Sequence, residues 1–197
     1  MTPSGITIGQ IGKIQELLGA GLRKSGLPSE PTQMIIEQQG EAFVTEFIAA
    51  FRKRVEAVDN IAVRHVFVNR SRMACEALGA TGQRQFVNSD VAKKMPRAEN
   101  DKADVIFFKL GRSISDSDLE REYELRGLMP ADPYSLAAVN EADPAFANGH
   151  PNSTHWKNAD DNWCYAAFSR WDDELDVDVN RDDGDWGDYW WFAGLRK

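Results

Sequence analysis

Hydrophobic residues recur at helical spacing in the first third of the chain and predict two helices. The first helix has an apolar stripe formed by Ile11, Ile14, Leu17, Leu18 and Leu22. The second has a stripe formed by Phe43, Val44, Phe47, Ile48, Phe51 and Val55. Gly26 and Pro28 end the first helix. Arg52, Lys53 and Arg54 are expected in the last turn of the second, where the helix dipole favours cations.

Beyond residue 60 the pattern changes to short β-branched or alternating runs separated by turn residues and short helices. Strands are expected at 61–69, 104–110, 154–156, 163–168, 176–180 and 190–196. In 176–180, Val177 and Val179 should face one side of the sheet, and Asp176, Asp178 and Asn180 the other. Helices are expected at 72–78, 89–95 and 117–126, the last opened by a capping box at Ser117, and after Asp132-Pro133 and Asp143-Pro144.

Composition and charge narrow the classes of function. The 197 residues fit one large domain or two small ones. The net charge of −8 argues against nucleic acid as a partner, since a phosphate backbone requires clustered Lys and Arg. No apolar run reaches the length of a membrane span, and no signal peptide is visible. These observations leave the location of the protein unknown.

The last thirty residues interleave large aromatic residues with small polar ones. The aromatic anchors are Trp171, Trp186, Trp190, Trp191 and Phe192. Tryptophan is typical of a packed core or an interface, whereas Asp and Gly are typical of solvated turns. Tyr, Trp, Asp, Ser and Gly are also the residues that antibody paratopes favour. The pattern therefore indicates a rigid scaffold that carries an exchangeable polar binding surface.

Candidate metal and catalytic sites are weak by comparison. Asp176, Asp178 and Asn180 imitate the opening of a helix-loop-helix calcium loop, but the sixth and twelfth positions hold Arg181 and Gly187 instead of Gly and Glu. We therefore predict no metal ligands and no cofactor.

The histidines and cysteines do not suggest an enzyme either. His65 is expected to be half-buried in its strand, and His150 and His155 to lie in a surface stretch. Cys75 and Cys164 are expected to be buried thiols, and a thiol in an apolar strand is usually inert. We therefore predict no catalytic residue and no enzymatic activity.

The polar residues of the tail form a narrow set that the genetic code explains. Changing only the adenines of an Asn codon gives Asp, Ser, Gly, Tyr, His and a few others, and never a stop codon. The tail positions in this set are Ser169, Asp173, Asp176, Asp178, Asn180, Asp182, Asp183, Asp185, Gly187 and Tyr189. On these residues the tail resembles the variable region of target proteins of diversity-generating retroelements. In that family a reverse transcriptase copies a template repeat with adenine errors into the 3′ end of the target gene.

The resemblance implies a fold and a function. The fold would be α+β, with a mainly helical N-terminal region over 1–100. A C-type-lectin-like domain, similar to formylglycine-generating enzymes, would occupy 101–197, with its diversified segment at 169–189. The ten residues would bind an unidentified macromolecular ligand, expected to be a protein. Self-association through the glycine-rich first helix is a further expectation.

Two other readings stay open: a calcium- or carbohydrate-binding lectin-like module, and a divergent enzyme of the formylglycine-generating type.

Overall fold

The computed structural model describes residues 6–181 and 184–197, and the chain divides into two compact units, Met1–Val55 and Glu56–Lys197. The sequence suggested a boundary near residue 100. The division falls earlier because strands that precede residue 100 belong to the sheet of the second unit: β1 (Ile61–Phe67) pairs along its whole length with β3 (Lys102–Lys109), and β2 (Arg84–Val87) pairs with β7 (Glu174–Arg181).

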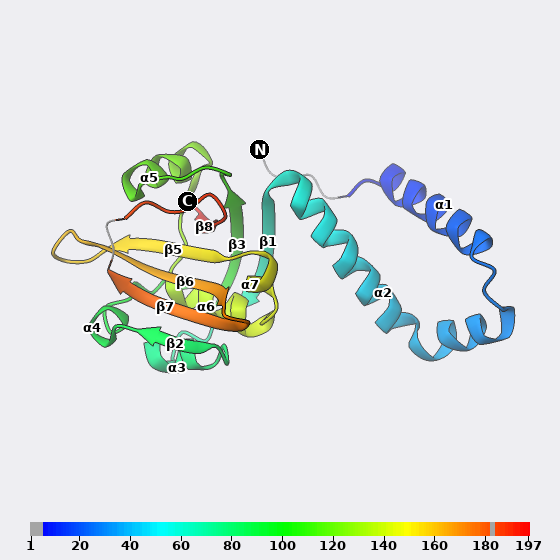
Figure 1. The fold of residues 1–197 in the computed structure, drawn as a ribbon, viewed down its shortest axis with the longest axis horizontal. Coiled ribbons are helices and arrows are strands. Elements are labelled where there is room, and N and C mark those ends of the chain that lie inside the picture. Colours follow the sequence, from blue (N-terminus) through cyan, green and yellow to red (C-terminus); the bar gives the residue numbers. More distant parts are fainter. Residues whose placement is uncertain (1–5, 182–183) are drawn as a thin grey trace. The chain divides into compact units, whose positions relative to one another are not determined.

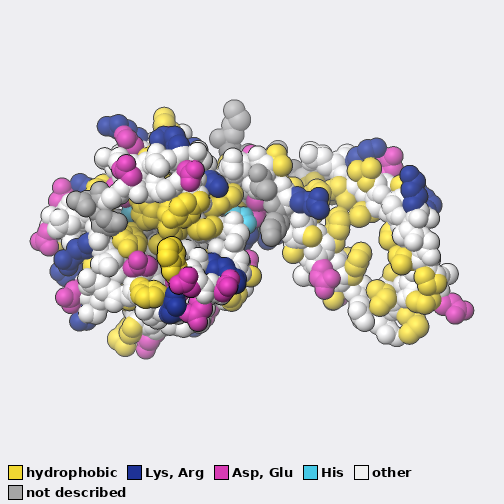
Figure 2. Space-filling model, in the orientation of Figure 1, with side chains coloured by type: hydrophobic (Ala, Val, Ile, Leu, Met, Phe, Trp, Pro, Cys, Tyr) yellow, Lys and Arg dark blue, Asp and Glu magenta, His cyan; other side chains and the backbone are white. Residues whose placement is uncertain are grey.

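The first unit consists of α1 (Ile8–Lys24) and most of α2 (Ser29–Asp59) (Figure 1). Thr7 and Gln10 form a capping box at the start of α1, and Gly26 takes a left-handed conformation after its end. Because α2 continues to Asp59, Arg52 and Arg54 do not lie in its last turn as expected. None of the residues of α1 is buried, and apolar side chains of both helices are exposed (Figure 2).

The second unit contains an eight-stranded sheet in the order β1-β3-β8-β5-β6-β7-β2, with β4 paired to β8. Its remaining strands are β4 (Leu128–Pro130), β5 (Asn152–Lys157), β6 (Trp163–Trp171) and β8 (Trp191–Arg196). Its helices are α3 (Ala74–Gly79), α4 (Ser89–Ala92), α5 (Asp116–Leu125), α6 (Pro133–Ala142) and α7 (Phe146–Gly149). The pairs β2–β7 and β5–β8 are parallel, and the others are antiparallel. The expected α+β class is confirmed.

Two hydrophobic clusters cover opposite faces of the central strands. Phe107 and Ala193, paired across β3 and β8, belong to the larger cluster with residues of α6. Their neighbours Phe108 and Phe192 belong to the smaller cluster, which includes Tyr123 of α5. Successive strand residues point to opposite faces of the sheet. Residues 107–108 of β3 and 192–193 of β8 therefore pack against a helix on each side of the sheet.

Two of the expected helix starts differ in the structure. The side chain of Ser115, rather than Ser117, caps α5 by accepting a hydrogen bond from the amide of Asp118. Asp132 caps α6 as expected, by accepting from the amide of Ser135. Asp143 does not start a helix, because it ends α6, and α7 begins only at Phe146.

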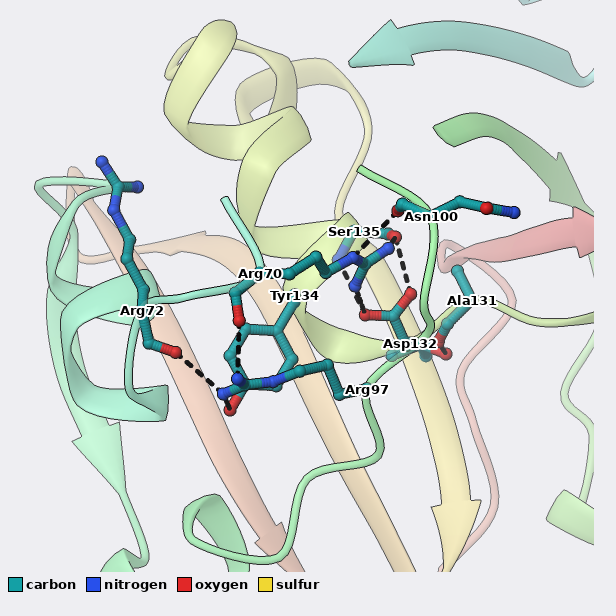
Figure 3. A network of polar contacts seen from close by, with 9 residues as sticks. Arg70, Arg72, Arg97, Asn100, Ala131, Asp132, Tyr134 and Ser135 are labelled. Atoms are coloured by element: carbon teal, nitrogen blue, oxygen red, sulfur yellow. Dashed lines mark hydrogen bonds and ion pairs between the residues drawn. The ribbon is translucent and has the colours of Figure 1, made fainter. Parts of the chain in front are cut away.

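A polar network holds two loops against the start of α6 (Figure 3). Arg70 forms an ion pair with Asp132 and donates to Ser135 Oγ at 2.9 Å. Arg97 donates to the carbonyl oxygen of Arg70 at 2.6 Å and to the hydroxyl of Tyr134 at 2.6 Å. The charges of both arginines are therefore used to fix loops of the scaffold.

Candidate ligand-binding site

The β6–β7 hairpin presents one buried face and one polar face. Phe168 and Val177 lie opposite each other and are fully buried in the core. Side chains that lie directly opposite in an antiparallel pair share a face of the sheet. On the other face the pairs are Ser169 with Asp176, Ala167 with Asp178 and Tyr165 with Asn180. The alternation predicted for 176–180 is confirmed.

Trp186 fixes the segment that follows the hairpin. Its backbone exchanges two hydrogen bonds with Ile114, of 2.8 and 3.1 Å, and its indole nitrogen donates to Asp116 Oδ1 at 2.8 Å. Its ring makes edge-to-face contacts at 5.5–5.7 Å with Tyr165, Trp190 and Phe192. Trp186 therefore attaches a loop to the hairpin, to β8 and to the start of α5.

A cavity of about 230 Å³ lies between the polar face of the hairpin and this loop. Five predicted ligand-binding residues line it: Ser169, Asp178, Asp185, Gly187 and Tyr189. The residue types around it are mainly aromatic and acidic, since Tyr165, Trp186, Trp190 and Asp116 complete much of the wall. Strand register and the Trp186 anchor thus bring together residues up to 20 positions apart in the segment 169–189.

The other predicted residues that the structure describes lie outside the cavity. Asp173 is at the tip of the hairpin, with its side chain 98% exposed, and Asn180 is exposed near the far end of β7. Asp176 is only 6% exposed, and both of its carboxylate oxygens accept hydrogen bonds from Arg84, at 2.8 and 3.0 Å. Asp182 and Asp183 lie outside the described residues.

The tryptophans of the tail are not equivalent anchors. Trp191 and Phe192 are buried in β8, and Trp186 and Trp190 are half-buried around the cavity. Trp171 is 68% exposed, so its expected role as a core anchor is wrong. It ends β6 immediately before the left-handed residues Asp172 and Asp173 of the hairpin turn, beyond the part of the strand that the core covers.

A charged cluster with a buried centre at His155 and Asp116 borders the cavity through Asp116. His155 Nδ1 lies 2.5 Å from Asp116 Oδ1, and Nε2 lies 2.9 Å from Glu120 Oε1. The imidazole also stacks on the ring of Trp163 at 4.8 Å. Burial by itself would lower the pKa of His155, but the contacts with Asp116 and Glu120 raise it above the ordinary value. Asp116 Oδ1 thus accepts a hydrogen bond from Trp186 and lies within hydrogen-bonding distance of His155 Nδ1.

The three histidines contradict their expected exposure. His155 has a side chain only 1% exposed, and His150 is buried between the rings of Phe146 and Trp191, whereas His65 is 75% exposed beside Asp104. No spacing rule connects His155 with Asp116, which lies 39 residues earlier and on another element. The only sign of this contact in the sequence is that the acidic Asp116 lies next to the helix start expected at Ser117.

The two cysteines differ in their burial. Cys164 is buried, and burial raises the pKa of its thiol. Cys75 is exposed rather than buried, and neither cysteine forms a disulfide. Within residues 6–181 and 184–197, no group of three or more His, Cys, Asp or Glu is arranged to hold a metal ion.

In the same ranges, no helix combines the length and hydrophobicity that crossing a membrane requires.

Comparisons with known proteins identify no relative. The chain matches no protein-family model, and no curated protein or solved structure is significantly similar to it. The function of this chain is therefore inferred from the geometry and chemistry of the site itself.

Proposed function

We propose that this chain is a non-catalytic ligand-recognition protein, with a C-type-lectin-like domain whose surface a diversity-generating retroelement diversifies. The observation that carries the proposal is the cavity beside the β6–β7 hairpin. The ten tail residues that adenine changes in an Asn codon can give are called the Asn-codon set. Five of them line the cavity, although they come from two strands and a loop. The requirements of folding alone do not explain why residues of this set surround one cavity.

The separation between scaffold and surface supports the same proposal. Val177 and Val179 are fully buried, while Asp178 between them faces the cavity. Trp186 is tied by its backbone and its indole nitrogen to residues outside the segment 169–189. Replacement of the intervening polar side chains would leave these contacts in place, which is the property that a repeatedly changed binding surface needs.

Asp176 is the exception among the ten predicted positions. It is buried and pairs with Arg84, so its replacement would leave an arginine without its carboxylate partner. Within the proposal, Asp176 is better explained as a scaffold residue.

The DNA that flanks the gene tests this proposal. We expect a reverse transcriptase gene nearby and a near-copy of the 3′ coding sequence. Its mismatches should fall at template adenines in the codons for Ser169, Asp178, Asp185 and Tyr189. The codons for Val177, Val179 and Trp186 serve as the internal control and should match the copy. Flanking DNA that lacks a near-copy, or mismatches spread equally over both groups of codons, would refute the proposal.

A further inference from the structure

We propose that the cavity beside the β6–β7 hairpin binds a cationic side chain, arginine or lysine, of a protein ligand. This inference rests on the proposed recognition function, and it adds the chemical class that this copy of the surface recognises.

The wall of the cavity combines aromatic rings with carboxylates. Four aromatic residues line it: Tyr165, Trp186, Tyr189 and Trp190. Cations bind the faces of such rings through the ring quadrupole, and tryptophan binds them best. Asp116, Asp178 and Asp185 also line the cavity, and no Lys, Arg or His is present among its described lining residues. An anionic or purely apolar group would gain nothing from these carboxylates.

The three carboxylates differ in what they already bind. Asp116 accepts hydrogen bonds from Trp186 and His155, and Asp178 accepts from the hydroxyl of Tyr165 at 2.9 Å. Asp185 is exposed at the rim and makes no hydrogen bond or ion pair with the residues that the structure describes. Asp185 is therefore the carboxylate most available to an entering cation.

The size of the cavity favours a single side chain. Its volume of about 230 Å³ is below the range of roughly 300–1,000 Å³ that is typical of small-molecule pockets. A guanidinium or ammonium group on an aliphatic stem fits this space. The cationic group can lie on the face of an aromatic ring while it forms an ion pair with Asp185. The net charge of −8 also attracts cationic ligands to the protein.

Two peptides that differ only in charge test this inference on the full chain. Acetyl-Gly-Arg-Gly-amide carries a guanidinium, and acetyl-Gly-citrulline-Gly-amide carries its neutral urea isostere. Binding is followed by the fluorescence of the tryptophans and by the NMR signals of the indole N–H groups. We expect the arginine peptide to bind about tenfold more tightly, and to weaken when salt is added.

A matched pair of variants locates the binding. Asp185→Asn and Asp160→Asn remove the same charge from exposed residues, but Asp160 lies in the loop between β5 and β6 and only Asp185 lines the cavity. We expect Asp185→Asn to weaken arginine-peptide binding several-fold and Asp160→Asn to leave it unchanged, with equal thermal melting. Equal affinity for the two peptides, or equal effects of the two variants, would overturn the inference. Either result leaves the proposed function standing if the flanking DNA contains the template copy.

Discussion

At the scale of single residues, the candidate site depends on buried polar contacts that support an exposed surface. Asp116 joins Trp186 of the loop to His155 of β5, and Glu120 supplies a second carboxylate to the same histidine. Removing one member of such a buried group leaves the others with unpaired charge. The polar residues at the rim, such as Asp185, carry no comparable structural role.

His155 gives this cluster a pH dependence whose direction is defined. Its pKa is raised in the folded protein, so the charged imidazole stabilises the fold fully below its unfolded pKa of about 6.5. This stabilisation is lost as the pH rises through the higher, folded-state value. Urea unfolding of the wild-type chain should therefore show falling stability over that range. His155→Gln should show a flatter profile, because it cannot titrate.

An NMR titration of the wild-type imidazoles is the second measurement for this experiment. It should show His155 titrating above 6.5. Parallel profiles for wild-type and His155→Gln, with His155 titrating at or below 6.5, would contradict the account of the cluster.

At the scale of helices and strands, strand alternation and one helix-start pattern in the sequence predicted the structure well. The run 176–180 became β7 with its valines inside, and Asp132-Pro133 opened α6. The strand β2 was not expected, because three of its four residues are exposed and it shows no alternating pattern. Trp171 was misplaced because composition does not show how far along a strand the core extends.

The candidate site was predictable only in part, for a similar reason. The Asn-codon set named five of its lining residues, since that argument needs only the identity of each residue. Tyr165, Asp116 and Trp190 enter the cavity wall through strand register and the Trp186 anchor. Such long-range pairings depend on the assembled sheet, which local spacing does not reveal.

At the scale of the whole molecule, the two units differ in how they are stabilised. The unit Glu56–Lys197 has two hydrophobic clusters of its own, whereas α1 buries no residue. Glu56 is buried and pairs with Arg64 at 2.5 Å and with His150 at 3.6 Å. The last turns of α2 therefore belong energetically to the second unit.

Two shortened chains test this division. A chain that begins at Phe51 keeps Glu56 and should unfold cooperatively with nearly the full-length melting temperature. A chain that begins at Asn60 loses Glu56, and should be less stable by about 3–5 kcal/mol, because Arg64 loses its buried partner. Equal stability of the two shortened chains, or failure of the first to fold, would contradict this division.

The same chains bear on the expected self-association. The exposed apolar side chains of the first unit are the surface that association would cover (Figure 2). Sedimentation of the full chain should then show an oligomer, and sedimentation of the chain that begins at Phe51 a monomer.

The central claim, that the recognition surface varies independently of the fold, is tested most directly by comparing two libraries. Both use Asn-codon adenine variants, so they sample the same residues. The first library varies Ser169, Asp173, Asp178, Asn180, Asp185 and Tyr189. The control library varies Ala166, Phe168, Val177, Val179, Trp186 and Trp191.

The measurement is the fraction of members in each library that fold, read by resistance to proteolysis. Surface substitutions usually change stability by less than about 0.5 kcal/mol, whereas polar replacements of buried apolar residues cost several times more. We predict that most members of the first library fold and that almost none of the control library does. Similar folded fractions in the two libraries would contradict the account.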